Sequence, residues 1–213
     1  ENWVGRDCIY LLSNDEDTII NSNIFRRTDS AAGGRQVAIS DDSNNYSNKV
    51  MIANNMFKDE TGEHALIAMI LQFGSNTQVL FNQVWGCDTF LQHKSYSNLD
   101  VIGNFVRDTN KGVYSPHAGG GSAGNDIRIL MNNMRILEKE YGIYAATNDS
   151  GTYGPKNYDV RFNDIDADIR LLNRSGAAGQ TENNICTGNK LRDGAVANVY
   201  SLITPDTNGN WSV

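Results

Sequence analysis

The segment NDIRILMNNMRILEKEYG (residues 125–142) carries the most regular apolar pattern in the chain. Its apolar side chains recur at i, i+3, i+4, i+7, i+10 and i+14, a spacing that places them on one face of an α-helix. These residues are Ile127, Leu130, Met131, Met134, Leu137 and Tyr141. Asn125 is suited to cap such a helix and Gly142 to end it. The pattern therefore predicts an amphipathic helix over residues 126–141.

Shorter apolar runs on both sides of this segment predict β-strands. Residues 36–40 and 49–53 flank a turn-forming stretch, which predicts a β-hairpin. Further strands are predicted at residues 78–85, 158–162, 165–172 and 195–203. The apolar runs at 65–73 and 100–106 are compatible with either a strand or a helix, because short apolar runs cannot be assigned by periodicity.

Residues 3–23 place apolar side chains at approximate helical spacing, so a second, N-terminal helix is expected. Because the predicted strands are not separated by regularly spaced helices, we expect an α+β fold with a mostly antiparallel sheet. A chain of 213 residues suffices for one core, and we predict a single domain over 1–213. Residues 147–156 resemble residues 40–49, which leaves open an internal duplication divided near 107–110.

Composition and charge narrow the classes of partner. The formal net charge of −7 argues against a broad grip on the phosphates of nucleic acid, and no apolar run is long enough to span a bilayer. The chain contains 27 Asn but only 7 Lys. Asn favours ordered turns, and uncharged polar side chains suit a surface that contacts sugars or copies of itself. A compositional bias without functional meaning is the alternative interpretation.

The first residues and the cysteines bear on the cellular compartment. The chain opens at Glu1 without an initiator Met or a leader-like segment, so a processed product is expected. Sequons at Asn45, Asn148, Asn173 and Asn210 permit glycosylation, although chance alone would give about as many. If the protein is exported, a disulfide is expected, with Cys87–Cys186 as the preferred pair because Cys8 lies near the chain end. Three free, buried thiols are the alternative.

Alternating acidic residues suggest a cation site. In a strand, Asp164, Asp166 and Asp168 would point the same way, and Ca²⁺ prefers such oxygen ligands. The EF-hand pattern fails, because Ile169 stands where the invariant Gly is needed. A solvated acidic face is the alternative to bound calcium.

The glycine-rich stretch Gly119–Gly124 matches two motifs at once. Gly119-x-Gly121-x-x-Gly124 fits a dinucleotide fingerprint, but Pro116 interrupts the residues where a buried strand would precede it. Gly120-x-Ser122-x-Gly124 fits a nucleophile elbow, but all three histidines precede Ser122, which excludes the usual order of serine, acid and histidine. Nucleotide binding by this loop is therefore kept only as an alternative.

Two further sets of residues are candidates for function. Cys87 could act as a nucleophile with His93 or His117 as its base, and scattered carboxylates could serve a glycosidase. Tyr46, Tyr114 and Tyr153 lie in Asn-, Ser- and Gly-rich turns, where aromatic rings beside amides suit a sugar or a protein partner.

Because no complete catalytic or metal-binding motif appears, we predict no catalytic residue and no cofactor except a possible Ca²⁺. The leading hypothesis is a non-enzymatic structural or adhesin-like protein, extracellular or on a particle surface, that acts by self-association or glycan contact and forms homo-oligomers. One alternative is a secreted polysaccharide or cell-wall hydrolase that uses carboxylates or Cys87. The other is a nucleotide-binding domain that uses Gly119–Gly124.

Overall fold

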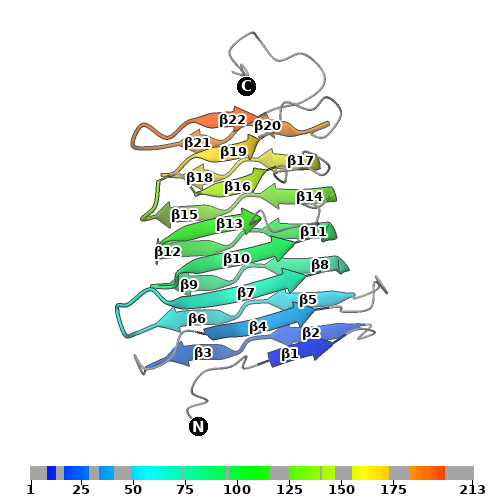
Figure 1. Cartoon of the computed structure of the whole chain (residues 1–213), viewed down its shortest axis with the longest axis vertical. Coiled ribbons are helices and arrows are strands. Elements are labelled where there is room, and N and C mark those ends of the chain that lie inside the picture. Colours follow the sequence, from blue (N-terminus) through cyan, green and yellow to red (C-terminus); the bar gives the residue numbers. More distant parts are fainter. Residues whose placement is uncertain are drawn as a thin grey trace.

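The chain folds as a parallel β-helix, in which three strands and three corners make one coil and successive coils stack along one axis (Figure 1). The computed structural model describes residues 9–12, 17–28, 34–40, 49–72, 74–94, 96–115, 125–139, 141–146, 155–172 and 183–199. Strands β1 to β21 form seven coils, and β22 begins an eighth. No helix occurs in this described part of the chain.

The strands form three parallel sheets, one along each side of the β-helix. Sheet A consists of β1 (Ile9–Leu12), β4 (Gly34–Ser40), β7 (Leu66–Gln72), β10 (Thr89–Lys94), β13 (Lys111–Ser115), β16 (Ile143–Ala146), β19 (Ile169–Leu172) and β22 (Ala197–Val199). Sheet B consists of β2 (Thr18–Asn21), β5 (Val50–Ala53), β8 (Ser75–Leu80), β11 (Ser97–Ile102), β14 (Asn125–Leu130), β17 (Lys156–Arg161) and β20 (Ile185–Thr187). Sheet C consists of β3 (Ile24–Arg27), β6 (Met56–Asp59), β9 (Gln83–Trp85), β12 (Phe105–Thr109), β15 (Asn133–Ile136), β18 (Asp164–Ile165) and β21 (Lys190–Leu191).

The core lies inside the coils and is built from columns of equivalent residues. Alternate residues of each strand point inward, and parallel pairing sets each inward side chain beside its equivalent in the next coil, about 4.8 Å away. The inner column of sheet B shows the pattern. It contains Ile20, Ile52, Val79, Val101, Ile129, Val160 and Cys186, all buried. In sheet C the rings of Phe25 and Phe57 stack with their centroids 4.8 Å apart.

An asparagine ladder runs through the corner between sheets B and C. Its members are Asn23, Asn55, Asn82, Asn104, Asn132, Asn163 and Asn189, one from each coil. Asn132 shows the repeating contacts: its Oδ1 accepts from the backbone N–H and the Nδ2 of Asn104, both at 2.9 Å. Its own Nδ2 donates to Oδ1 of Asn163 and to the carbonyl of Val101, again at 2.9 Å. The ladder thereby provides hydrogen-bond partners for buried backbone groups at the corner, where the chain turns and strand pairing cannot provide them.

The residue before each ladder Asn has a left-handed backbone, which turns the chain from sheet B into sheet C. These residues are Ser22, Asn54, Phe81, Gly103, Met131, Phe162 and Gly188, with φ between 52° and 67°. The turn is therefore a fixed geometric unit that recurs once in each coil.

The predicted helix at 126–141 is wrong, because this segment forms β14, the B–C corner and β15. Its buried apolar residues alternate along the two strands as Ile127, Ile129, Met134 and Ile136. Met131 and Leu137, which the helical face would bury, are 57% and 50% exposed. Apolar residues alternate with polar ones in both β14 and β15, but the left-handed corner at Met131 separates the two strands. The combined spacing of the apolar residues then resembles that of a helix.

The α+β fold with a mostly antiparallel sheet is wrong for the same reason: all three sheets are parallel. In the described part of residues 3–23, the predicted N-terminal helix is replaced by β1 and β2. The β-hairpin predicted from residues 36–40 and 49–53 is also wrong, although both segments form strands, β4 and β5. β4 pairs with β1 and β7, and β5 pairs with β2 and β8, so consecutive strands belong to different sheets.

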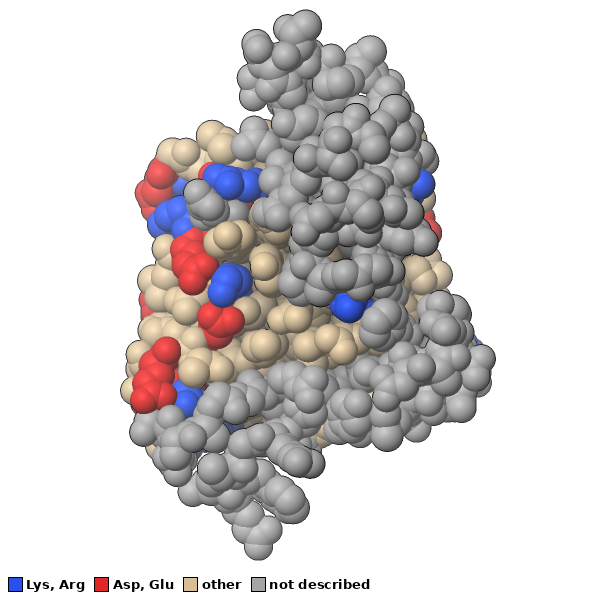
Figure 2. Space-filling model, in the orientation of Figure 1, with Lys and Arg blue, Asp and Glu red and all other residues tan. Residues whose placement is uncertain are grey.

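The corner from sheet C to sheet A is packed closely and bears charge. A Cβ added to Gly112 would lie 2.1 Å from the carbonyl oxygen of Gly142 in the next coil. Ion pairs link coils at this corner, among them the buried Arg27 with Asp59 at 2.9 Å and Lys111 with Asp88 at 3.3 Å. Figure 2 shows the visible Lys, Arg, Asp and Glu side chains gathered mainly along one edge of the face that sheet A presents.

His93 lies inside the β-helix, on β10, and is fully buried. Its Nε2 is 3.4 Å from the hydroxyl of Tyr158, and its Nδ1 has no hydrogen-bond partner among the described residues. Burial lowers the pKa of His93 to about 4, because the interior disfavours the charged imidazolium. His93 therefore belongs to the core, and it does not lie on an exposed catalytic surface.

We expect Asn132→Ala to lower the free energy of unfolding by about 3–5 kcal/mol, because it removes the side-chain partner of the buried backbone N–H of Asn104 and of the carbonyl of Val101. Asn23→Ala is the matched control. Asn23 is exposed at the end of the ladder, so its loss should cost about 1 kcal/mol. Equal losses in chemical denaturation of the two variants would show that the ladder does not stabilise the coils.

Gly112→Ala should destabilise the protein by about 2–3 kcal/mol, because the added methyl group collides with the backbone of the next coil. Gly62→Ala separates this steric effect from backbone strain. Gly62 has a φ of +76° but nothing within 4 Å of the added Cβ, so we expect a cost of about 1 kcal/mol. If thermal unfolding shows that Gly62→Ala lowers stability more than Gly112→Ala does, the coils are not packed as closely at Gly112 as the structure has them.

His93 should make stability fall as the pH falls from about 6.5 to about 4. The unfolded chain takes up a proton near pH 6.5, whereas the folded chain resists protonation until about pH 4. Between pH 7 and 5 the wild-type protein should therefore lose about 2 kcal/mol more than His93→Leu, in which this group is absent. Denaturation at both pH values measures the difference, and identical pH dependence in the two proteins would contradict it.

Candidate functional site

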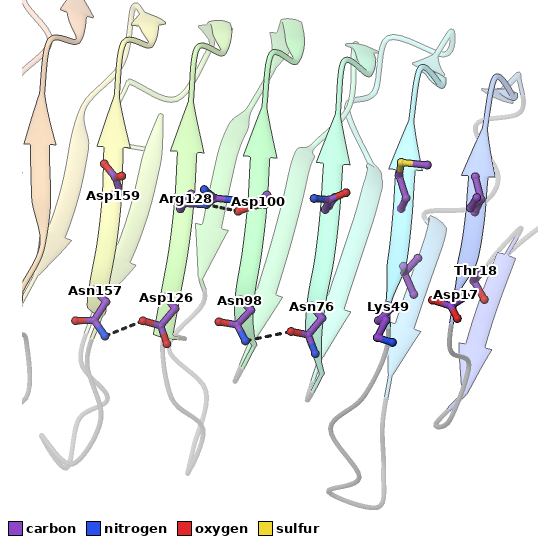
Figure 3. Close-up of a pocket in the computed structure, with 14 residues that line it drawn as sticks. Asp17, Thr18, Lys49, Asn76, Asn98, Asp100, Asp126, Arg128, Asn157 and Asp159 are labelled. Carbon is purple, nitrogen blue, oxygen red and sulfur yellow. Dashed lines mark hydrogen bonds and ion pairs between the residues drawn. The ribbon is translucent and has the colours of Figure 1, made fainter.

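A shallow groove runs across the outer face of sheet B, parallel to the axis of the β-helix (Figure 3). It has a volume of about 830 Å³ and extends over six coils, a length of about 24 Å at the spacing of adjacent strands. Two rows of outward-pointing side chains line most of it. The strands of a parallel sheet hold equivalent residues at the same height, so the rows follow directly from the fold.

The first row lies where each strand of sheet B begins. It contains Asp17, Lys49, Asn76, Asn98, Asp126 and Asn157. All except Lys49 have a left-handed backbone, which Asn and Asp tolerate better than most residues. Two hydrogen bonds join neighbouring coils within the row: Asn98 donates to Oδ1 of Asn76 at 3.1 Å, and Asn157 donates to Oδ1 of Asp126 at 2.8 Å.

The second row is charged at one end and apolar at the other. It contains Ile19, Met51, Gln78, Asp100, Arg128 and Asp159. Arg128 makes a bidentate ion pair with Asp100, with both N–O distances at 2.5 Å, and this hydrogen bonding raises the pKa of Arg128. Asp159 is paired with Arg161. The two rows together hold four carboxylates, two cations and four amides, so the groove offers many donors and acceptors without a strong charge of one sign.

The chemistry available in this groove is hydrogen bonding. Asp100 and Asp159 are held by guanidinium groups and Asp126 by an amide. Among the described residues that line the groove, none is a serine or a cysteine. The described residues thus provide a rigid, elongated polar surface on which a ligand rich in hydroxyl groups could lie.

The three aspartates predicted to bind calcium are each engaged by other groups. Asp164 pairs with Arg192 and Arg135, and these contacts, led by the hydrogen bond from Arg192, lower its pKa to about 2. Asp166 accepts from the backbone N–H of Ile136 at 2.7 Å and from Nζ of Lys139 at 2.8 Å.

Asp168, the third predicted ligand, pairs with Arg170. Among the residues that the structure describes, no group of three or more His, Cys, Asp or Glu side chains could hold a metal ion. Calcium binding at these positions stays a prediction without structural support.

The predicted Cys87–Cys186 disulfide is absent, and both cysteines are buried free thiols. Cys87 follows β9 in the third coil, whereas Cys186 lies on β20 in the seventh. Four coil spacings separate them by about 19 Å, far beyond the reach of a disulfide. Burial raises the pKa of the Cys87 thiol well above its usual value and that of Cys186 to about 11, which disfavours the nucleophilic thiolate.

Tyr114, predicted to contact a glycan or partner, lies on β13 in a cluster of three tyrosines. Its ring centroid is 5.6 Å from that of Tyr141 and 5.5 Å from that of Tyr144. Tyr114 is partly buried, and the cluster is on sheet A, away from the groove.

Several other predicted features lie outside the described residues. These are Tyr46, Tyr153, His117, Ser122 and the stretch Gly119–Gly124. By connectivity, each belongs to a segment that joins a strand of sheet A to the next strand of sheet B.

Sequence reasoning missed both rows of the groove. The signal was present, because an Asn or Asp residue stands at the start of an alternating run once per coil, as in Asn76, Asn98, Asp126 and Asn157. The interval between these residues varies from 22 to 31, so a search for a fixed period does not find it.

Comparison of the chain with known protein families, curated proteins and solved structures found no match. Within the described residues, no helix has the length and apolar character needed to cross a membrane. Function must therefore be inferred from the geometry and chemistry of the groove.

Proposed function

We propose that this protein is a non-enzymatic surface or extracellular protein that binds an extended polysaccharide along the groove of sheet B. The observation that carries this proposal is the row of polar side chains that runs across six coils beside a second row that is polar from the third coil to the sixth. Amides and carboxylates at regular intervals can donate to and accept from the hydroxyl groups of successive sugar units. The stacked coils keep these groups in place, so little ordering is needed when the ligand binds.

The shape and charge of the groove favour a long and weakly charged ligand. An open groove of about 24 Å suits a polymer better than a small molecule, which a deeper cavity would enclose. The mixture of carboxylates with Lys49 and Arg128 also disfavours a strongly anionic chain. We further propose, from the sequence alone, that the rings of Tyr46 and Tyr153, which lie outside the described residues, contribute to sugar contact.

A polysaccharide hydrolase is the second candidate, because four carboxylates, those of Asp17, Asp100, Asp126 and Asp159, line the same groove. Such an enzyme requires one carboxyl group as an acid and another as a base or nucleophile. Asp100 and Asp159 are each engaged by a guanidinium group, that of Arg128 and that of Arg161, so neither carboxylate is free to contact a glycosidic oxygen. We therefore place binding ahead of hydrolysis.

The proposal predicts that Asn98→Gly weakens polysaccharide binding about tenfold, equivalent to the loss of about 1.4 kcal/mol from hydrogen bonds in the groove. Glycine accepts the left-handed backbone of Asn98, so the variant should fold normally. The measurement is affinity electrophoresis and calorimetry with neutral, acidic and basic polysaccharides.

Asn54→Gly is the matched control for this experiment. Asn54 has the same backbone conformation and donates to Asn21 of the neighbouring coil at 3.0 Å, but it lies outside the groove. The control should bind as the wild type does. If no polysaccharide binds, or if both variants bind equally, the groove is not the sugar site. Release of reducing ends from a bound polysaccharide would instead support the hydrolase.

A further inference from the structure

A second, smaller pocket lies on sheet C, where its strands end before the corner to sheet A. Its volume of about 500 Å³ falls within the range of about 300–1,000 Å³ that is typical of small-molecule sites. We call it the Trp85 pocket. Its lining comes from coils two to four and consists of Met56, Lys58, Asp59, Trp85, Gly86 and Asp108. The groove on sheet B is lined by entirely different residues.

The Trp85 pocket forms where a row of side chains is interrupted. Asp59, Gly86 and Asp108 directly follow three residues that are aligned across sheet C, so they occupy the same corner position in coils two, three and four. Gly86 has no side chain, which leaves a gap between the two aspartates. An added Cβ would lie 2.6 Å from the carbonyl oxygen of Asp59, and φ at Gly86 is +67°, so the position favours glycine.

The two aspartates beside the gap differ in their availability. The side chain of Asp59 is fully buried, and its oxygens accept from Nη1 of Arg27 at 2.9 Å, the N–H of Thr61 at 3.0 Å and the N–H of Ala65 at 3.2 Å. Asp108 is exposed and forms no ion pair or hydrogen bond with any other described residue. Asp108 is therefore the carboxylate that a ligand in the pocket can reach.

Lys58 places a positive charge in the same pocket. Its Nζ lies 3.0 Å from Oε1 of Glu60, which also pairs with Arg26 at 2.9 Å. An ammonium group has three N–H donors, so the contact with Glu60 leaves two of them for a ligand. The side chain of Lys58 is 42% exposed. The pocket thus combines an accessible donor with an accessible acceptor.

Trp85 supplies an aromatic wall. Its side chain is partly exposed, and Met56 of the preceding coil lines the pocket beside it. The ring of Phe105 lies 6.1 Å from that of Trp85, but the guanidinium of Arg107 sits over the Phe105 ring at 4.1 Å. The indole is therefore the aromatic surface that the pocket offers to a ligand.

This combination of groups selects a class of ligand. A cation would be attracted by Asp108 and Trp85 but repelled by Lys58, and an anion would be repelled by Asp108. A neutral ligand with hydroxyl groups, which both donate and accept, can use both charged groups at once. A sugar ring carries such hydroxyls together with a C–H face that can lie on an indole.

We propose that the Trp85 pocket is a second carbohydrate site, which holds a single neutral sugar unit. One hydroxyl of the sugar accepts from Nζ of Lys58, another donates to the carboxylate of Asp108, and the C–H face rests on Trp85. The pocket spans two coil spacings, about 10 Å, which suits a chain end or a side branch better than a long polymer. The proposal does not depend on the groove being a sugar site, because no residue is shared.

The first test follows the indole N–H signal of Trp85 by NMR while neutral methyl glycosides of hexoses, deoxyhexoses and N-acetylhexosamines are added. Trp85→Phe lacks this signal and so identifies it among those of the three tryptophans. At least one glycoside should shift the signal to saturation. Asp108→Gly should weaken that binding about tenfold through loss of a charged hydrogen bond. Glycine accepts the φ of 49° at this position, so the variant should fold.

Asp193→Gly is the matched control. Asp193 is also an exposed aspartate with a left-handed backbone, at a φ of 56°, but it lies outside the pocket, so this variant should bind the glycoside as the wild type does. Asn98→Gly, which alters the groove, should leave the response of Trp85 unchanged. Asp108→Gly should in turn leave polysaccharide binding in the groove unchanged, so that failure of either site is distinguishable from failure of the other.

The second test exchanges the specificity of the pocket. Lys58→Met keeps an unbranched side chain but removes the ammonium, which leaves Trp85 and Asp108 as a site for a cation. Tetramethylammonium should shift the Trp85 signal in this variant but not in the wild type, and the glycoside should bind about tenfold more weakly. The proposal is overturned if no glycoside shifts the Trp85 signal, or if Asp108→Gly and Asp193→Gly weaken binding equally. Tighter binding of tetramethylammonium or acetate than of any glycoside by the wild type would overturn it as well, as would a Lys58→Met variant that does not respond to tetramethylammonium.

Discussion

The asparagine ladder is the interaction on which the remaining structure depends. Each inner member accepts from a backbone N–H and donates to a backbone carbonyl of the preceding coil, and its amide also donates to the ladder Asn of the following coil. Coil-to-coil register at the B–C corner is therefore set by hydrogen bonds of fixed length. Apolar columns alone would not set this register, because a slip of one strand by two residues still leaves apolar side chains inside. Once the corner is fixed, the register of the strands on both sides of it is fixed as well.

The ladder also explains much of the unusual composition. Of the 27 Asn residues, seven form the ladder. Five more have a left-handed backbone at coil corners: Asn54, Asn76, Asn98, Asn157 and Asn183. Asn is used at these sites because its amide can donate and accept at once and because it tolerates positive φ. The abundance of Asn therefore reflects the architecture first, and the groove uses side chains that the corners already require.

Strands were easier to predict from the sequence than their partners. The apolar alternation at Val79, Val84 and Val160 correctly indicated strands, because inward and outward positions differ in polarity. The pairing could not be read, since each strand bonds to residues about 20 to 30 positions away, with loops of unequal length between them. At residues 125–142 the corner residue Met131 breaks the alternation, and the resulting spacing imitates a helix. The aspartates at 164, 166 and 168 were recognised as a cluster, but the arginine and lysine partners of Asp164 and Asp166 come from other coils and left no local signal.

Two corner rows with nearly the same backbone conformation have been filled with different chemistry. At the start of sheet B the row is Asn and Asp except for Lys49 in the second coil, and it borders the groove. At the end of sheet B the equivalent row changes from Ser and Asn to Phe and Met as the chain passes from the second coil to the third. Because the backbone demand is the same in both rows, backbone geometry does not explain the change. The difference lies in the surface that each row presents: polar side chains beside the groove, and the more than half-exposed apolar side chains of Phe81, Met131 and Phe162 at the other corner. A repeated corner can thus change its surface chemistry by side-chain substitution alone, without any alteration of the coil that carries it.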